Sequence, residues 1–553
     1  MRMPGPAERV TTVTAGEGDR PGGSARGRTG AGRAGGLAWL VLGLLLIVPI
    51  WWGTDASFPW ESDNIAPGSV LKGMAVHFGP GWYSTYGPLP YYLTAAAYAP
   101  LLAVVKLTGE LERPSSVYPF GFVHPDAAIA ALVILARLVT LLFGLGTVWL
   151  AARRVVQEQG SAAAWLAPLF FLGSIQFAFY TRVSNVDVHA LFWLWLAVEL
   201  VERTASWRWL ALGAAAAALA VCCKEQSGPM SAALVAAAAW KALRGPSGPL
   251  AGRAVRALGV VLAAGLAYAL VWQLPWNLGG WQAHHRFLFE SALGSRSFPA
   301  TPAGFAALAW RCVQYLPLAF GWPVLAGLAL ALALRASWRG LGLRALCSAV
   351  FLVGFIGRIG YLFPRFLLPV LVLAVPLAAR GVMAALRALR ERRGVARGLV
   401  AGIAFASITG TPLLTGLMLA DPRLPAERWL ERNVPPGATI EVAGNGHINL
   451  RVPHRYRLER VTAKTLLAAP RGPVGDVVVI GTIDTMLLRR DPQVRALWWD
   501  AVHEAPPAGR YRRVAYFRRP ALAELTRPMW ICPGAMIYQR VPGSAPDGGS
   551  LRP

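Results

Sequence analysis

The stretch Trp60-Glu-Ser-Asp-Asn64 places two carboxylates, Glu61 and Asp63, directly after the first hydrophobic segment of the chain. The aromatic and proline-rich run Trp82-Tyr-Ser-Thr-Tyr-Gly-Pro-Leu-Pro-Tyr-Tyr92 follows and begins another apolar stretch. Ionised side chains are costly beside hydrocarbon, so acids at such a border indicate a specific role. We interpret this stretch as part of the functional site. The interpretation depends on the side of the membrane that the stretch faces.

The composition identifies a membrane protein with several spans. Of 553 residues, 55% are hydrophobic and 15% are charged, whereas soluble domains carry about 25% charged residues. Leu, Ala, Val and Trp predominate and Gly and Pro are frequent, which is typical of helical bundles rather than outer-membrane barrels. The fold class we expect is therefore an all-α polytopic membrane bundle.

The net charge of +26 does not indicate a nucleic-acid partner. The arginines sit in short clusters between apolar segments, which is the pattern that sets membrane topology. The five cysteines show no metal-ligand spacing and lie where a disulfide framework is not expected. We expect no cofactor and no requirement for a divalent metal.

The first apolar segment sets the orientation of the chain. Residues 1–35 are rich in arginine and lack apolar periodicity, so we expect a disordered cytoplasmic tail. Residues 37–52 end in two tryptophans and are not followed by a small-residue cleavage site, so we expect an uncleaved helix that runs from inside to outside. Glu61 and Asp63 then lie outside.

Clusters of arginine and lysine decide the topology of the later segments. From residue 127 onward a cluster follows every second apolar segment, so all clusters can face the cytoplasm only if 127–151 runs from outside to inside. The segment 89–107 therefore cannot cross, and its prolines and tyrosines suit a helix that lies in the membrane interface. The clusters lie at 153–154, 203–208, 241–256, 335–344 and 380–397.

We predict a membrane domain over 36–419 with eleven spanning helices and an external loop, 53–126, that holds one or two membrane-parallel helices. The segment 303–334 is too long for one span of about 20 residues, so its first half is a further candidate for an interfacial helix. The expected spans lie near 37–52, 127–151, 161–179, 188–202, 208–223, 227–243, 257–274, 303–334, 343–360, 365–380 and 396–419.

Residues 420–541 differ in character, because they are charged and contain no run long enough to span a membrane. The pattern predicts a helix over 426–433 and strands over 477–480 and 514–517. We expect a small external α/β domain, followed by a disordered tail over 542–553.

This topology brings acids and bases to one side of the membrane. The outward-facing candidates are Glu61, Asp63, Tyr86, Arg182, Asp187, Lys224, His284, His285, Arg358 and Arg365.

The order of these motifs resembles the polytopic lipid-linked-sugar glycosyltransferases of the GT-C fold, such as the protein O-mannosyltransferases and the bacterial aminoarabinose lipid A transferases. The resemblance covers roughly residues 37–520. One departure is that the family often has adjacent acids in the first loop, whereas Ser62 separates the two acids here. The motifs that carry the resemblance are the acidic pair, Gly87-Pro-Leu-Pro-Tyr-Tyr92, Arg182-Val-Ser-Asn-Val-Asp187, Pro364-Arg-Phe-Leu-Leu-Pro369 and the segment 426–437.

The resemblance implies transfer of a sugar from a polyprenyl-phosphate donor to an external lipid, glycan or protein acceptor. It further implies inversion at the sugar carbon without a covalent intermediate. Such a transfer needs a base for the acceptor proton and cations for the leaving phosphate. We assign Asp63 as the base, because it corresponds best to the first-loop acid of the family, and Glu61 as the alternative base or an acceptor contact.

The remaining candidates are assigned to substrate binding. We expect Lys224, Arg358 and Arg365 to meet the phosphate, and Arg182 and Asp187 to lie in the cavity. His284, His285 and Tyr86 are candidates for contacts with the sugar; an adjacent histidine pair lacks the spacing of a zinc site.

Structural roles are the alternatives for these residues. Asp63 and Asp187 also suit helix caps, and Lys224 can pair with Glu225. The arginines can extend to the membrane interface, and Tyr86 is of a type enriched there.

Two other functions stay open. A lipid or sugar transporter would show paired repeats and ionisable groups near the bilayer centre, whereas the candidate charges here lie at helix borders. A non-catalytic envelope assembly protein with the same fold is the other alternative, because the two acids are separated. For each function we expect a multi-pass protein of a bacterial-type inner membrane.

The predicted topology can be tested by cysteine labelling. Single cysteines at Ser84 and Arg154 should react from opposite sides of the membrane, because the topology places them at opposite ends of the spanning helices. Labelling of both from outside would show that the segment 89–107 crosses the membrane.

Overall fold

The computed structural model describes most of the chain, and Glu61 and Asp63 lie outside the described residues. The predicted tails over 1–35 and 542–553 lie largely outside them too. The described residues are 25–54, 60, 65–203, 206–245, 249–294, 297–336, 339–444, 450–469, 471–481, 491–500, 502, 510–524 and 532–542.

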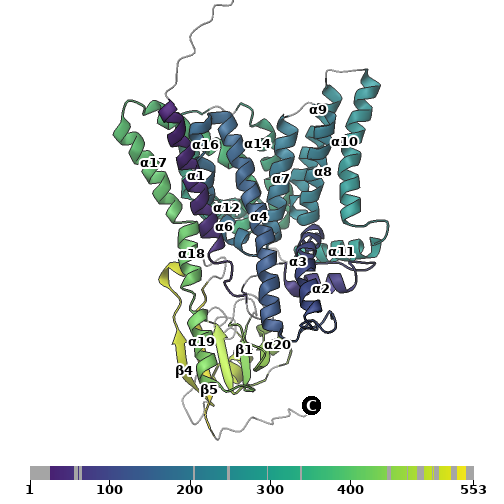
Figure 1. Cartoon of the computed structure of the whole chain (residues 1–553), viewed down its shortest axis with the longest axis vertical. Coiled ribbons are helices and arrows are strands. Elements are labelled where there is room, and N and C mark those ends of the chain that lie inside the picture. The colour runs from purple at the N-terminus through teal and green to yellow at the C-terminus, as the bar shows by residue number, and fades with distance from the viewer. Residues whose placement is uncertain are drawn as a thin grey trace, which may run out of the picture.

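A bundle of apolar helices forms the larger part of the molecule, and a sheet domain lies beyond one end of it (Figure 1). Within the described residues, five helices are long and apolar enough to cross a membrane, or up to seven if each of two bent pairs is one span. The chain is therefore a multi-pass membrane protein, and the number of eleven spans stays a prediction. The bundle helices are α1 (Ala25–Ile47), α4 (Pro125–Gln159), α5 (Leu166–Gly173), α6 (Ile175–Arg182), α7 (Val186–Arg203), α8 (Trp207–Cys223), α9 (Gly228–Arg244), α10 (Leu250–Val271), α12 (Pro302–Ala319), α13 (Trp322–Ala333), α14 (Gly342–Phe351), α16 (Leu371–Ala388), α17 (Arg393–Ile408) and α18 (Thr411–Leu419).

Two helices extend beyond their predicted limits. Helix α1 begins at Ala25, inside the segment expected to be disordered. Helix α4 has 35 residues, which is longer than one span requires. Its first turn reaches the sheet domain, where Asp126 Oδ2 lies 3.2 Å from Nδ1 of His454.

The arginine clusters meet at the end of the bundle opposite the sheet. Nη2 of Arg154 lies 3.1 Å from Glu202, and Nε of Arg344 lies 3.0 Å from the same carboxylate. Nη2 of Arg380 lies 2.6 Å from Glu158, which Arg154 also contacts. The loops that join α9 to α10 and α16 to α17 lie at this end as well (Figure 1). The structure therefore places these clusters at one end of the bundle. That this end faces the cytoplasm stays a prediction.

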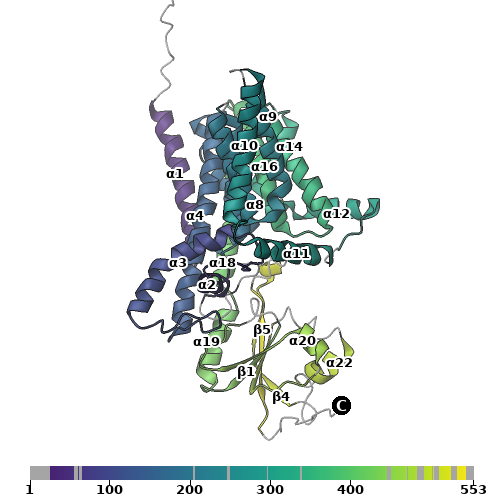
Figure 2. The ribbon, with the colours of Figure 1, turned by 90° about the vertical axis from the view of Figure 1, so that its right-hand side faces the viewer.

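Helices that cross the bundle axis lie at the end next to the sheet (Figure 2). Helix α3 (Leu89–Leu107) is not among the candidate spans and runs obliquely below the bundle, as predicted for 89–107. Helix α2 (Pro67–Ala75) packs against it, and α11 (Leu278–Gly294) lies nearly perpendicular to the bundle helices. The sequence analysis did not predict α11 as a helix of this kind.

Three helix breaks meet inside the bundle, and glycine allows each of them. The α5–α6 pair bends by 78° after Gly173, and the α12–α13 pair bends by 115° at Gly321, which divides the overlong segment 303–334. The third break is at Gly410, between α17 and α18. A Cβ on Gly321 would lie 2.3 Å from the carbonyl oxygen of Gly173, and one on Gly410 would lie 2.2 Å from that of Leu172. Side chains would force these backbones apart.

The C-terminal domain is a five-stranded mixed sheet with helices on both faces. The strand order is β2-β1-β3-β5-β4, with β1 parallel to β2 and β3, and β5 antiparallel to β3 and β4. Leu430 of α19 packs on one face and Leu466 of α20 on the other. The predicted helix and two strands are present with longer bounds as α19 (Arg423–Asn433), β3 (Val477–Gly481) and β4 (Tyr511–Phe517). The elements of the domain that the sequence does not predict are β1 (Thr439–Ala443), β2 (Arg457–Val461), α20 (Ala463–Ala468), α22 (Pro492–Val494) and β5 (Ala535–Arg540).

Gly321→Ala should destabilise the protein by about 2–4 kcal/mol, because its Cβ meets a backbone oxygen and its φ of +79° is unfavourable for an L-residue. Gly265→Ala in α10 is the control, since nothing lies within 4 Å of its Cβ. Thermal unfolding in detergent measures both variants. Equal melting temperatures for Gly321→Ala and the wild type would contradict the close packing of the three breaks.

Candidate active site

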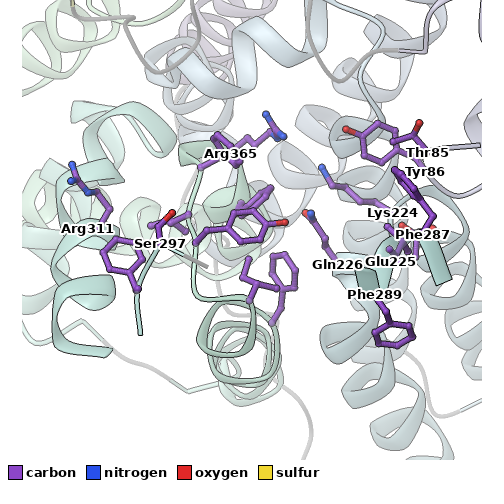
Figure 3. Close-up of a pocket in the computed structure, with 18 of the residues that line it drawn as sticks. Thr85, Tyr86, Lys224, Glu225, Gln226, Phe287, Phe289, Ser297, Arg311 and Arg365 are labelled. Atoms are coloured by element: carbon purple, nitrogen blue, oxygen red, sulfur yellow. The ribbon is translucent and has the colours of Figure 1, made fainter. Parts of the chain in front are cut away.

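A cavity of about 830 Å³ opens where the helices end near the sheet domain. Its walls come from the segment before α3, from α11 and α12, and from the irregular segments η2 (Glu225–Ser227), η3 (Leu352–Ile356), α15 (Gly357–Ile359) and η4 (Pro364–Val370). Figure 3 shows Lys224 and Gln226 on one side, Arg311 and Ser297 on the other, and Arg365 between them. The lining residues are Thr85, Tyr86, Lys224, Glu225, Gln226, His285, Phe287, Leu288, Phe289, Ser297, Phe298, Arg311, Tyr315, Phe355, Ile359, Tyr361, Leu362, Phe363, Arg365 and Phe366.

Helix ends place the charged residues at this cavity. Lys224 is the C-cap of α8 and is extended, with φ −154° and ψ 117°, so the chain leaves the helix there. Arg365 lies in the 3₁₀ segment η4, which begins at Pro364 and contains Pro369. Proline cannot donate a backbone hydrogen bond and so opposes a regular helix at this point. Asp187 lies in the first turn of α7.

A single carboxylate pairs with two of the cavity cations. Nζ of Lys224 lies 2.6 Å from Oδ1 of Asp187, and Nε of Arg365 lies 3.4 Å from Oδ2. Nη1 of Arg365 also donates to the hydroxyl of Tyr180 at 3.0 Å. The side chains of Lys224, Arg365 and Asp187 are 3%, 8% and 9% exposed, so these three charged groups are nearly dry.

Aromatic rings flank both cations. Lys224 Nζ lies 5.3 Å from the ring centroid of Tyr86 and 5.5 Å from that of Phe366. The Arg365 guanidinium lies 4.8 Å from the centroid of Phe363. Ring faces attract cations, so these contacts hold the two charged groups at the cavity.

Glu225 pairs with His284 and not with its sequence neighbour Lys224. His284 is fully buried, its Nδ1 lies 2.7 Å from the carbonyl oxygen of Ser84, and its Nε2 lies 2.8 Å from Oε1 of Glu225. A carbonyl only accepts, so Nδ1 carries a hydrogen, and the Nε2 contact to a carboxylate then requires a further shared proton. This pair fixes α11 to the segment before α3 and presents Glu225 to the cavity.

His285 belongs to an aromatic part of the wall on α11. Its Nδ1 lies 2.9 Å from the carbonyl oxygen of Trp281, and its ring centroid lies 4.3 Å from that of Trp281. Burial lowers the pKa of His285, so the ring is neutral at neutral pH. A neutral imidazole among indole rings suits contact with a sugar or lipid better than contact with phosphate.

Two predicted binding residues lie away from the cavity lining. Arg182 is fully buried and its Nη2 donates to the carbonyl oxygens of Leu45 and Thr411, at 2.7 and 3.2 Å, so it joins α6 to α1 and α18. Arg358 is exposed on α15 and is not among the lining residues. We therefore do not propose a direct contact with substrate for either residue.

Two residues with defined contacts, Trp60 and Ile65, flank the predicted catalytic acids in the sequence. Trp60 is fully buried, and the backbone N–H of Ile65 donates to the carbonyl oxygen of Ser184 at 2.6 Å. Ser184 lies three residues before Asp187 in sequence. The chain that carries Glu61 and Asp63 is therefore tied to the segment that carries Asp187.

The cavity includes residues that the sequence analysis missed. Arg311, Tyr315 and Tyr361 line it, yet each lies in an apolar or aromatic segment with no local motif. The bend between α12 and α13 brings Arg311 and Tyr315 to the wall, and no sequence signal specifies a bend of that size. Among the described residues, no group of three or more His, Cys, Asp or Glu side chains could hold a metal ion.

No protein-family profile and no curated protein sequence matches the chain. Solved structures with a similar arrangement are ArnT from Cupriavidus metallidurans bound to undecaprenyl phosphate and the archaeal oligosaccharyltransferase AglB from Archaeoglobus fulgidus. The first is 14% identical, covers 91% of this chain and 98% of its own, and has a TM-score of 0.47. The second is 12% identical, covers 94% of this chain and 89% of its own, and has a TM-score of 0.42. Residue roles in this chain therefore have to be argued from its own contacts.

Asp187→Asn should destabilise the protein by about 3–5 kcal/mol, because two nearly buried cations lose their shared carboxylate. The double variant Asp187→Asn/Lys224→Met should recover part of that loss, since one unpaired charge is removed. Thermal unfolding in detergent compares the three proteins. If the single variant were as stable as the wild type, the ion triad would not hold α7, α8 and η4 together.

Proposed function

We propose that this protein is a membrane glycosyltransferase that transfers a sugar from a polyprenyl-phosphate donor to an acceptor on the outer face of the membrane. The observation that carries the proposal is the pair of cations, Lys224 and Arg365, that share Asp187 at the wall of an 830 Å³ cavity. Two cations at a wall that is otherwise largely apolar and aromatic suit a lipid phosphate better than a free sugar.

The cavity has separate regions for the parts of such a donor. Lys224 and Arg365 suit the phosphate, as a point charge and a planar fork respectively. The phenylalanines of α11 and η4, among them Phe287, Phe289 and Phe366, suit the isoprenoid chain. Glu225, Gln226 and Thr85 offer polar contacts for the sugar.

The proposed reaction is a direct displacement at the sugar carbon. Asp63 takes the proton from the acceptor, the acceptor oxygen forms a bond to the sugar carbon, and the bond from that carbon to the phosphate oxygen breaks. The leaving phosphate gains negative charge, which Lys224 and Arg365 stabilise. Two residues of extended chain reach at most about 7 Å, so the link between Ile65 and Ser184 supports a base close to the Asp187 segment.

The distribution of charge favours transfer over transport. The cavity cations lie at the helix ends next to the sheet domain and the interfacial helices, whereas transporters bind substrate near the bilayer midplane. The opposite end of the bundle carries the arginine clusters, so we propose that it faces the cytoplasm and that the sheet domain lies outside. A bacterial-type inner membrane is the membrane we propose.

Lys224→Met and Asp63→Asn should separate binding from transfer. Lys224→Met should weaken binding of undecaprenyl phosphate by about tenfold or more, because a charge-assisted contact is lost. Asp63→Asn should leave that binding unchanged and lower transfer by about 10²–10⁴-fold, the contribution of a general base. Binding is measured on the purified protein, and transfer by mass spectrometry of envelope glycans in a complemented deletion strain.

Two controls accompany these variants. Arg286→Met removes an exposed cation from α11 that does not line the cavity, and should bind undecaprenyl phosphate as the wild type does. Glu61→Gln tests the alternative base: full activity in Asp63→Asn together with its loss in Glu61→Gln would move the assignment to Glu61. A wild-type protein that binds nucleotide sugars and no polyprenyl phosphate would refute the proposed function.

A further inference from the structure

Glu225 is the only carboxylate among the described residues that line the cavity. It follows Lys224 directly in the chain, and Figure 3 shows both residues on the same side of the cavity. Its side chain is 18% exposed, whereas that of its partner His284 is fully buried. The wall thus combines two cations with one carboxylate, which suits a ligand that has both an anionic part and a hydrogen-bond-donating part.

The two carboxylate oxygens of Glu225 have different surroundings. Oε1 lies 2.8 Å from Nε2 of His284. Within the described part of the chain, Oε2 has no hydrogen bond or ion pair. Because the proton of the pair lies between Oε1 and Nε2, Oε2 can only accept a hydrogen bond. It is therefore available to a donor group of the ligand.

Two hydrogen bonds fix the helix from which His284 reaches Glu225. Nδ1 of His284 donates to the carbonyl oxygen of Ser84 at 2.7 Å. Nδ2 of Asn277, which lies directly before α11, donates to the carbonyl oxygen of Trp82 at 2.9 Å. Both bonds join α11 to the segment before α3, so the imidazole has a fixed position relative to the cavity wall.

The position of Glu225 next to the phosphate site selects the part of the sugar that it can reach. Consecutive Cα atoms are about 3.8 Å apart, so Glu225 adjoins Lys224, which meets the donor phosphate in the proposed function. The parts of the sugar closest to that phosphate are the carbon that bears it and the neighbours of this carbon. Among the groups on these atoms, the 2-hydroxyl is the hydrogen-bond donor.

We propose that Oε2 of Glu225 accepts a hydrogen bond from the 2-hydroxyl of the donor sugar, and that His284 is the positioning residue for the carboxylate. This role rests on the proposed function, because it needs a sugar joined to the phosphate that Lys224 and Arg365 bind. A hydrogen bond from the 2-hydroxyl strengthens as the sugar carbon gains positive charge, so it also favours the transition state. The substrate class is a lipid-phosphate sugar with a free 2-hydroxyl.

Three lipids test this contact by their affinity for the full-length protein in detergent. They are undecaprenyl phosphate joined to glucose, to mannose and to 2-deoxyglucose, and the last lacks the hydroxyl whose orientation distinguishes the first two. The wild type should bind the glucosyl or the mannosyl lipid about ten- to hundredfold more tightly than the 2-deoxy lipid, the range for a hydrogen bond to a charged group. Equal affinities for all three lipids would overturn the proposal.

Glu225→Ala should abolish the preference for the 2-hydroxyl. It should bind undecaprenyl phosphate itself at least as tightly as the wild type, because an acid beside the phosphate site is removed. Glu290→Gln, at an exposed position of α11 outside the cavity lining, is the matched control and should keep the full preference. A preference that survives in Glu225→Ala, or that is lost in Glu290→Gln as well, would contradict the contact. If Glu225→Ala does not fold, Glu225→Gln replaces it, and an undiminished preference in that variant overturns the proposal.

Two replacements of His284 separate positioning from packing. A glutamine amide can take the place of Nε2 and donate to Glu225, whereas an asparagine amide can take the place of Nδ1 and donate only to Ser84. His284→Gln should therefore keep most of the preference for the 2-hydroxyl, and His284→Asn should lose most of it. An equal preference in these two variants would overturn the positioning role.

Undecaprenyl phosphate without a sugar distinguishes failure of this contact from failure of the proposed function. If the wild type binds this lipid but does not discriminate among the three sugar lipids, the proposed function stands and the contact at Glu225 is wrong. If the wild type binds none of the four lipids, both are wrong.

Discussion

The site depends on one constraint: a single carboxylate, Asp187, pairs with two nearly buried cations from distant parts of the chain. Charges this dry are stable only where partners meet closely, so the start of α7, the end of α8 and the start of η4 have to lie close together. Helix ends also free the backbone to turn toward the cavity, as Lys224 shows by leaving α8 in an extended conformation. Pairing and chain direction together place both cations at the cavity wall.

At the opposite end of the bundle, the arginines pair with more carboxylates. There, Arg344 is fully buried and contacts both Glu199 and Glu202, while Arg154 and Arg380 share Glu158. Several carboxylates match the cations at that end, and none of these residues lines the cavity. The network at that end stabilises helix packing, whereas Lys224 and Arg365 line a cavity.

The sequence predicted the helical bundle and the C-terminal α/β domain, but it predicted few of the side-chain contacts. Arginine spacing predicted that α3 lies in the membrane interface, and α3 runs obliquely below the bundle (Figure 2). This prediction used the order of charges along the chain and did not need their partners. The sequence did not predict that Glu225 pairs with His284 rather than with Lys224. Nor did it predict that the Arg182 guanidinium donates to carbonyl oxygens of α1 and α18. Such pairings join residues far apart in sequence, so only the packed structure specifies them.

The bend between α12 and α13 depends on close glycine packing, and it also shapes the cavity. Backbone that leaves the helical conformation inside a membrane domain is tolerated only where protein surrounds it, and the contact of Gly321 with Gly173 and of Gly410 with Leu172 provides that enclosure. The bend of 115° turns α12 away from α13, and α12 thereby contributes Arg311 and Tyr315 to the cavity wall. A straight helix over the same segment would carry these two residues along the bundle axis. These two close glycine contacts are therefore a condition for the shape of the proposed donor site and not only for the stability of the bundle.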